Sequence, residues 1–262
     1  MPAKKGSTMD NSLLIGLSRQ VALGRELDVV ANNIANLNTT GFKADGSIFE
    51  EYLSPTARTG AASNNKVSYV RDLGTWHDLS QGPTKQTGGP LDVAIDGKGF
   101  LVVQTPRGER YTRNGALQLG PTGNLMTTDG YPVVGDAGPI NIQANDRDIS
   151  ISANGTISVR NGNTNDDASR GKLKLVVFDD KQTMQLAKDA SATFAAPDGV
   201  TPQADKSSRV VQGAIEGSNV RGVVEITRMI DITRSYTQVA TMMQQLSDMG
   251  NSAIDKLADV PA

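Results

Sequence analysis

The chain has 262 residues, a formal net charge of −2, one histidine and no cysteine. This length can bury a sizeable core as one or two domains, and the charge gives no sign of a nucleic-acid or anionic-membrane partner. The absence of cysteine excludes disulfides, thiolate metal sites and cysteine nucleophiles. No apolar run approaches the ~20 residues that span a bilayer, and the N-terminus lacks the pattern of a cleaved secretory signal.

The N-terminal region predicts a helix with an unusual end. Residues 1–9 are expected to form a disordered leader, and apolar side chains then recur at three- and four-residue spacing within residues 10–43. The last part, "ANNIANLNTTGFK", holds four asparagines followed by two threonines and a glycine. Gly41 can adopt the left-handed conformation that ends a helix.

The middle of the chain predicts a linker and then strands. Residues 44–86 are rich in Gly, Ser, Asn and Thr and have few apolar pairs, which favours an extended linker. Residues 87–204 predict a β-rich domain, in which "DISISANGTISVR" is typical of a hairpin that bends at Asn154-Gly155 and "LKLVVF" is typical of a strand. Residues 205–222 are predicted to be a return linker.

Residues 223–262 are predicted to form a C-terminal helix with a heptad seam, a pattern typical of a coiled-coil contact. The seam comprises Ile232, Tyr236, Val239, Met243, Leu246, Gly250, Ala253 and Leu257. Because isolated helices are marginal in water, we expect the terminal helices to pair with each other or with other subunits. The predicted fold is α+β, with long N- and C-terminal helices pairing as a coiled coil, a central mostly-β domain and an extended linker.

The sequence contains no constellation typical of an enzyme. His77 is the only histidine, which excludes two-histidine metal sites and leaves one candidate general base; we interpret it as a surface or interface residue. "DGKGF" at 96–100 lacks the spacing of a phosphate-binding loop, and "NGNTNDD" at 161–167 lacks the glutamate that ends a calcium-binding loop. We therefore expect no catalytic residue, no metal site and no cofactor.

Four stretches carry longer motifs, in this order along the chain: "ANNIANLNTTGFK", "GPLDVAIDGKGFLVVQT", "ERYTRNGALQLGPTGNLMTTDGYPVVG" and "EGSNVRGVVEITRMIDITRSY". Together they resemble the rod and hook axial proteins of the bacterial flagellum, and they cover most of the chain outside the predicted linker. The N-terminal segment is similar to the proximal-rod type more than to the distal-rod type. Residues 1–8 precede the usual start of the family, and Arg221 stands where the family commonly has asparagine.

The resemblance implies a structural, non-enzymatic component of the flagellar basal-body rod, in its proximal part. Such a protein assembles helically with other rod proteins and copies of itself, and transmits torque from motor to hook. The resemblance also implies export through the flagellar type III apparatus, without a cleaved signal, to the rod that crosses the periplasm. It implies neither nucleic-acid binding nor membrane insertion.

Three alternatives stay open at this point. One is a distal-rod protein of the same family. Another is a secreted β-domain binding module that oligomerises through its helical ends. The third is an enzyme that uses His77.

The residues predicted to mediate assembly lie near the two ends. Asparagine amides carry no charge, so Asn32 and Asn36, four residues apart on one helical face, can be buried between subunits without stacking like charges. Capping of the helix end accounts for Asn38 but not for asparagines further inside the helix. Residues 218–220 are expected to fix the re-entry into the C-terminal helix. The full predicted set is Asn32, Asn33, Asn36, Thr39, Thr40, Gly41, Phe42, Ser218, Asn219, Val220, Ile232, Tyr236, Val239, Met243, Leu246 and Leu257.

Overall fold

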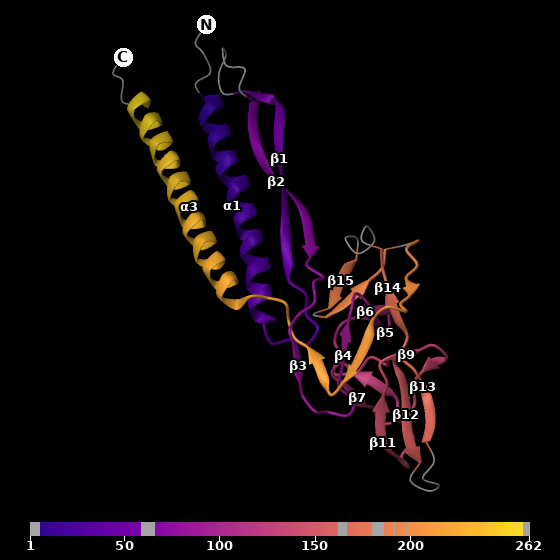
Figure 1. Ribbon diagram of the computed structural model, residues 1–262. Coiled ribbons are helices and arrows are strands. Elements are labelled where there is room, and N and C mark those ends of the chain that lie inside the picture. Colours follow the sequence, from indigo (N-terminus) through magenta and orange to yellow (C-terminus); the bar gives the residue numbers. More distant parts are fainter. Residues whose placement is uncertain are drawn as a thin grey trace. The chain divides into compact units, whose positions relative to one another are not determined.

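The computed structural model describes residues 6–58, 66–161, 167–179, 186–190, 192–197 and 199–258. In these residues a helix lies near each end of the chain, and strands occupy the region between them (Figure 1). The predicted α+β class and the mostly β centre agree with this arrangement. The chain divides into two compact units, which we call the helical unit (residues 1–34, 45–76 and 222–262) and the β unit (residues 35–44 and 77–221).

The helical unit contains two long helices and a strand pair. The helices are α1 (Gly6–Ala35) and α3 (Gly222–Ala258), and the strands are β1 (Asp45–Arg58) and β2 (Lys66–His77). The observed α3 begins one residue before the predicted start at residue 223, and residues 259–262 of the predicted span lie outside the described residues. Among the described residues, neither helix is both long and apolar enough to cross a membrane.

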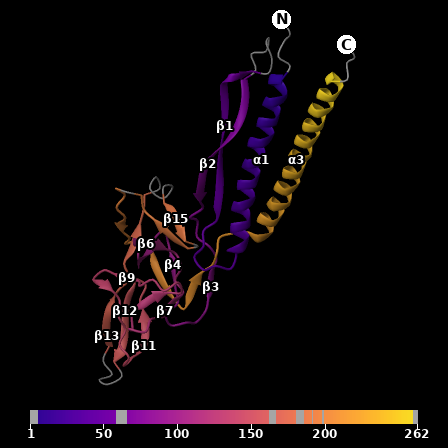
Figure 2. The ribbon, with the colours of Figure 1, turned by 180° about the vertical axis from the view of Figure 1, so that it is seen from behind.

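The predicted pairing of the two helices as a coiled coil is wrong. α1 and α3 lack the continuous close backbone approach of a coiled coil, and they separate toward the chain ends (Figures 1 and 2). A local contact joins them where Met243 lies against Gly16. A coiled coil requires an apolar seam on both helices. On α1, the apolar side chains of Leu17 and Val21 are 49% and 64% exposed, so the seam of α3 has no continuous counterpart there.

The predicted extended linker is also wrong, because β1 and β2 form a two-stranded sheet within it. Strand formation depends on the pairing partner and on packing more than on composition, so a segment rich in small polar residues can still form strands. Gly46 illustrates the packing. A Cβ atom at this position would lie 2.3 Å from Nε1 of Trp76, so the glycine makes room for the indole ring.

The β unit is built from short strands. They are β3 (Thr84–Gln86), β4 (Val93–Asp96), β5 (Phe100–Thr105), β6 (Gly108–Thr112), β7 (Leu117–Leu119), β8 (Leu125–Thr127), β9 (Val134–Gly135), β10 (Gly138–Pro139), β11 (Asp146–Ile151), β12 (Thr156–Asn161), β13 (Asp167–Lys172), β14 (Leu175–Val177), β15 (Ala187–Ala190), β16 (Thr193–Ala195), β17 (Gln203–Ala204), β18 (Arg209–Gln212) and β19 (Ala214–Glu216).

The largest sheet of the β unit has the strand order β15-β16-β6-β5-β14-β17. At its centre, β5 and β6 pair antiparallel, with Leu101 opposite Thr112 and Thr105 opposite Gly108. A second sheet has the order β11-β12-β13, and the remaining strands pair as β18-β4, β19-β3, β7-β8 and β10-β9. The pairs β18-β4 and β19-β3 join the end of the β unit to its beginning, so residues far apart in sequence are neighbours there.

Two apolar clusters fill the β unit. The alternation of side chains along a strand sends the residues of β5 to opposite faces, so this strand contributes to both clusters. The first cluster contains Val93, Ile95, Leu101, Val103, Leu117, Leu125, Val133, Ile140, Ile151, Ile157, Val159, Leu173, Leu175 and Val210. The second contains Phe100, Val102, Tyr111, Val176, Phe178, Leu186 and Phe194.

The predicted hairpin at "DISISANGTISVR" is confirmed. β11 and β12 pair antiparallel, and Ile151 lies opposite Ile157. At the bend, Gly155 has a φ of 83°, a conformation in which a residue with a side chain is strained. The strand predicted at "LKLVVF" is present as β14.

Candidate functional site

The N-terminal signature segment (residues 31–43) begins in the last turn of α1 and continues as a tight turn. The backbone N–H of Thr39 donates to Asn36 O at 3.2 Å, and the Thr39 hydroxyl donates to Asn36 Oδ1 at 3.0 Å. The N–H of Phe42 then donates to Thr39 O at 3.3 Å. Asn36 and Thr39 therefore help to end the helix and to reverse the chain direction.

Gly41 allows this segment to pack directly on the backbone of the β unit. Its φ is 70°, and a Cβ atom at this position would lie 2.3 Å from Asn114 N and 2.4 Å from the carbonyl carbon of Arg113. Its N–H donates to Glu216 O at 2.8 Å. Only glycine fits such an approach, which accounts for glycine at the end of the signature.

Phe42 is fully buried in the β unit. Lys188 covers its ring, with Nζ 3.5 Å from the ring centroid, and donates to Lys43 O at 3.1 Å. Phe42 therefore anchors the signature segment within its own chain. Its predicted role between subunits stays a prediction.

Asn33, also predicted as an assembly residue, is 1% exposed and binds within the helical unit. Its amide exchanges two hydrogen bonds with the backbone of Asp45: Nδ2 donates to Asp45 O at 2.9 Å, and Oδ1 accepts from Asp45 N at 2.8 Å. Nδ2 also donates to Glu225 Oε2 at 3.2 Å. This side chain therefore holds the start of β1 and the first turn of α3 against α1.

The other asparagines of the segment differ in exposure. Asn32 and Asn38 are exposed, while Asn36 is half-buried, as is Thr40. An uncharged, exposed amide suits a surface that another subunit covers. The roles of Asn32, Asn36 and Thr40 in assembly stay predictions.

A buried ion cluster, formed by Lys43, Arg113 and Glu216, brings three motifs together. Lys43 and Glu216 are fully buried, and Arg113 is 2% exposed. Lys43 Nζ donates to Glu216 Oε1 and, at 2.6 Å, to Ser80 O. Arg113 Nη1 donates to Glu216 Oε2 at 3.1 Å. The backbone N–H of Gly82 completes the set by donating to Glu216 Oε1 at 2.9 Å.

The cluster holds two cations and one carboxylate. Burial lowers the pKa of Lys43 below its ordinary value of 10.5, although the neighbouring Glu216 carboxylate opposes this change. Burial also lowers the pKa of Arg113, against the same carboxylate. Glu216 therefore pairs one negative charge with two buried cations, and it is the member on which the other two depend.

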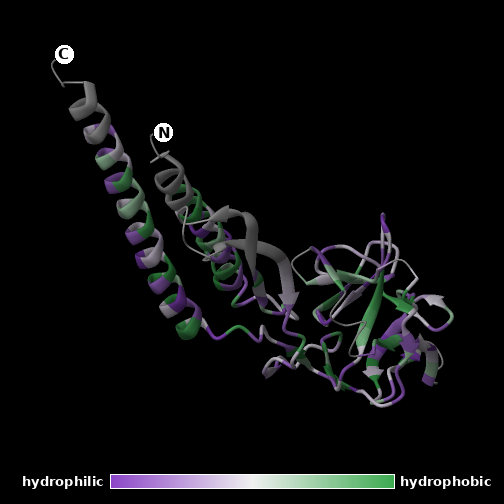
Figure 3. Cartoon of the chain, turned by 90° about the horizontal axis from the view of Figure 1, so that it is seen from above, coloured by the Kyte–Doolittle hydropathy of each residue, from purple (hydrophilic) through white to green (hydrophobic). Residues whose placement is uncertain are grey.

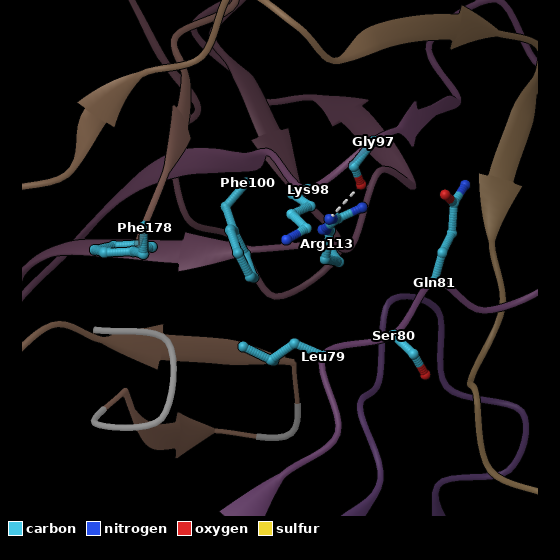
Figure 4. A pocket seen from close by; sticks show the side chains of 8 residues that line it. All are labelled: Leu79, Ser80, Gln81, Gly97, Lys98, Phe100, Arg113 and Phe178. Carbon is cyan, nitrogen blue, oxygen red and sulfur yellow. Dashed lines mark hydrogen bonds between the residues drawn. The ribbon is translucent and has the colours of Figure 1, made fainter. Parts of the chain in front are cut away.

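Arg113 also lines a cavity of about 430 Å³ beside the cluster. The walls are apolar at Leu79, Phe100 and Phe178, and Figure 4 shows these side chains around the opening. Arg113 Nη2 donates to Gly97 O at 2.6 Å (Figure 4), and its guanidinium carbon lies 5.0 Å from the centroid of the Phe100 ring. These contacts hold the guanidinium in place for Glu216.

The predicted re-entry residues lie beside the N-terminal segment. Asn219 Oδ1 accepts from Ala44 N at 2.8 Å, and Asn219 Nδ2 donates to Asp78 O at 2.8 Å. Ser218 is 7% exposed, and its hydroxyl accepts from Val220 N at 3.3 Å. The two signature segments, distant in sequence, are therefore neighbours in the β unit.

The predicted seam of α3 is buried unevenly. Ile232 and Val239 are 5% and 8% exposed, Met243 and Leu246 are half-buried, and Tyr236 is 37% exposed. The side chain of Leu257 lies outside the described side chains. The assembly role of the seam stays a prediction.

Both helices also expose apolar side chains that the seam does not include. On α1, Leu14, Leu17 and Val21 recur at spacings of three and four residues and are 51%, 49% and 64% exposed. On α3, Ile226 and Ile230 are each 46% exposed. Figure 3 shows hydrophobic residues alternating with hydrophilic ones along α3. Apolar surface repeated at helical spacing is typical of a face that packs on another protein.

The residues considered for catalysis, phosphate binding and calcium binding lie in different parts of the chain. His77 packs edge-on against Phe194, with ring centroids 5.6 Å apart, and the "DGKGF" segment turns at Gly97 between β4 and β5. Most of "NGNTNDD", residues 162–166, lies outside the described residues. Within the described residues, no group of three or more His, Cys, Asp and Glu side chains is arranged to hold a metal ion.

Comparison with known families matches the chain in three regions. The family described as "Flagella basal body rod protein" matches residues 13–43. "Flagellar hook protein FlgE/F/G D1 domain" matches residues 94–159, and "Flagellar basal body rod FlgEFG protein C-terminal" matches residues 211–256. These regions contain or overlap the signature motifs.

Curated relatives match nearly the whole chain. It is 40% identical to the flagellar basal-body rod protein FlgF of Caulobacter vibrioides over 254 residues, 96% of this chain and 100% of the relative. Identity to FlgF of Escherichia coli K12 is 34% over 256 residues, 94% and 97% of the two chains. Identity to the rod protein FlgG of Agrobacterium fabrum is 31% over 261 residues, 92% and 97%. The chain therefore belongs to the flagellar basal-body rod protein family.

Family membership confirms the function predicted from the motifs: the chain is a structural component of the flagellar basal-body rod. The two FlgF relatives are more similar to it than this FlgG protein is, which favours the FlgF type within the family. Sequence reasoning missed Lys43, Arg113 and Glu216 as a group. The available signal was that each motif carries one of these charges: "TTGFK", "YTRNG" and "EGSNV".

Proposed function

We propose that this protein is a non-enzymatic subunit of the proximal rod, where it binds other rod proteins and copies of itself and carries torque toward the hook. We further propose that it is exported through the flagellar type III apparatus to the rod, which crosses the periplasm, and that no N-terminal signal is cleaved from it. The observation that carries the assembly part is the exposed apolar surface on both helices, at Leu17, Val21 and Ile230 among others.

Burial of these exposed apolar side chains between subunits favours association. Full burial of one Leu, Ile or Val side chain contributes about 1.5–3 kcal/mol. Leu17, Val21 and Ile230 are each about half exposed, so neighbouring subunits that cover them gain roughly half of that value per residue. Repeated along two helices, such gains stabilise a contact that a single subunit does not make by itself.

Ile230→Asp tests the proposal. Because Ile230 is exposed, the substitution is expected to weaken assembly without disturbing the fold of the subunit. The parent and the variant replace the chain in cells that lack it, and isolated basal bodies are probed for the chain. The parent is expected in the rod, and Ile230→Asp is expected to be absent from it. Leu119→Asp, at a 44% exposed position of β7, is the matched control and is expected to enter the rod. Incorporation of Ile230→Asp at the parent's level would contradict the proposal.

The distal rod is the second candidate, because the FlgG relative also matches 92% of the chain. Labelling the chain in isolated basal bodies distinguishes the two positions along the rod. Mass spectrometry of the N-terminal peptide in the same sample tests the export route: an unprocessed N-terminus supports it, and a cleaved one contradicts it.

A further inference from the structure

The chain passes between the helical unit and the β unit four times, after residues 34, 44, 76 and 221. Within the β unit, these passages continue into three segments: residues 35–44, 77–82 and 216–221. Any load that travels along the covalent chain from one unit to the other must pass through these three segments. Their attachment to one another therefore decides whether they act together or separately.

Backbone hydrogen bonds already join the segments in pairs. Gly41 N donates to Glu216 O at 2.8 Å, and Asp78 N donates to Ala44 O at 2.8 Å. Asn219 N donates to Phe42 O at 3.4 Å. The first segment is thus bonded to each of the other two.

The Asn219 side chain joins all three segments at one point. It accepts from Ala44 N at 2.8 Å and donates to Asp78 O at 2.8 Å and to Ser80 O at 3.2 Å. A side-chain amide has one acceptor group and one double donor, and both are used here. Few other side chains can bridge an N–H and two carbonyl groups in this way.

Lys43 and Glu216 repeat the same connection in the buried interior. Lys43, from the first segment, donates to Ser80 O in the second and to Glu216 in the third. Glu216 also accepts from Gly82 N. Burial strengthens these charge-assisted bonds, because the surrounding dielectric is low.

We propose that Asn219, Lys43 and Glu216 form a clamp that holds the four chain passages together as one rigid part of the β unit. The clamp lies entirely within residues 35–44 and 77–221, so it is a property of the β unit alone. Its mechanical meaning rests on the proposed function: in a subunit that carries torque, the clamp distributes load over all four passages.

Hydrogen–deuterium exchange on the purified chain tests the clamp, with Asn219→Ala as the main variant. Exchange at the N–H groups of Ala44 and Asp78 is expected to rise by roughly tenfold or more, because bonds that order these segments are lost. Exchange in the β5–β6 pair is expected to stay unchanged. Asn141→Ala is the matched control: its amide donates to Thr122 O and Asn124 Oδ1 at an exposed site, and neither region should respond to its loss.

Lys43→Met is an independent second variant, since it removes the bond to Ser80 O while Glu216 keeps Arg113 as its partner. It is expected to raise exchange in residues 77–82 and to spare β5 and β6. Unchanged exchange in both variants would overturn the clamp, and so would an equal rise in β5 and β6, which indicates general loss of stability. Because the readout uses purified protein, it is independent of whether the chain enters a rod.

Discussion

Replacing Glu216 with glutamine tests the ion cluster most directly. The substitution keeps the shape of the side chain and removes its charge, so Lys43 and Arg113 are left as two buried cations without their carboxylate. Breaking a buried ion pair by removing one partner costs about 3–5 kcal/mol. That is a large part of the roughly 5–15 kcal/mol by which a domain is stable.

The assay is thermal and urea unfolding of the purified chain, followed by the signals of the β unit. For a unit of this size, 1 kcal/mol shifts the melting temperature by roughly 2–4 °C, so Glu216→Gln is expected to lower it by roughly 6–20 °C. Glu109→Gln is the matched control. Glu109 is 43% exposed and pairs with Lys174 at the surface, where the loss is expected to stay within about 0.5 kcal/mol.

The charge argument also predicts an order among the variants. Lys43→Met leaves Glu216 and Arg113 as a neutral pair, so it is expected to cost less than Glu216→Gln. Two results would refute this reasoning. One is a loss in Glu216→Gln no larger than in Glu109→Gln, and the other is a Lys43→Met variant at least as unstable as Glu216→Gln.

Two further predictions concern single positions. Gly41→Ala is expected to destabilise the β unit by more than the roughly 1–2 kcal/mol of left-handed strain, because the added Cβ atom would also clash with backbone atoms. Gly88→Ala is the control in the same melting assay, since Gly88 has nearly the same φ of 72° but open space around it and therefore measures the strain alone. Equal losses of stability in the two variants would contradict the steric argument. The Arg170 guanidinium holds the pKa of Asp146 below its ordinary value of 3.8, so the stability it contributes is present above that pH and is lost as pH falls through the lower, folded-state pKa. Urea melts from pH 6 to pH 2 should therefore show Asp146→Asn less stable than the parent at pH 6, with the difference disappearing toward pH 2; a difference independent of pH would contradict this assignment.

Periodicity predicted the elements that repeat over many residues. The apolar spacing of α3 persists for more than three heptads, so its start could be placed within one residue. The β11–β12 hairpin was also predictable, since Asn-Gly between two alternating runs specifies a tight turn locally. The strand pair β1–β2 was not, because its residues become strands through pairing with each other rather than through apolar alternation.

The coiled-coil prediction failed for a related reason. An apolar seam on one helix shows which of its side chains can be buried. It does not show what buries them, because that depends on the residues of a second surface. The ion cluster shows most clearly what the sequence alone does not predict. Lys43 and Glu216 are 173 residues apart, and neither motif contains a local feature that identifies the other as its partner. Each motif showed a charge, and only the fold shows that the charges meet.

The positions where the chain enters and leaves the β unit have a consequence for how the chain can be altered. Gly41 and Glu216 are joined by a backbone hydrogen bond of 2.8 Å, and so are Ala44 and Asp78. Segments whose two ends already touch can be lengthened, shortened or exchanged without moving their surroundings. Both the β1–β2 pair and the body of the β unit are thus suited to replacement by an engineer while the two terminal helices keep their sequence.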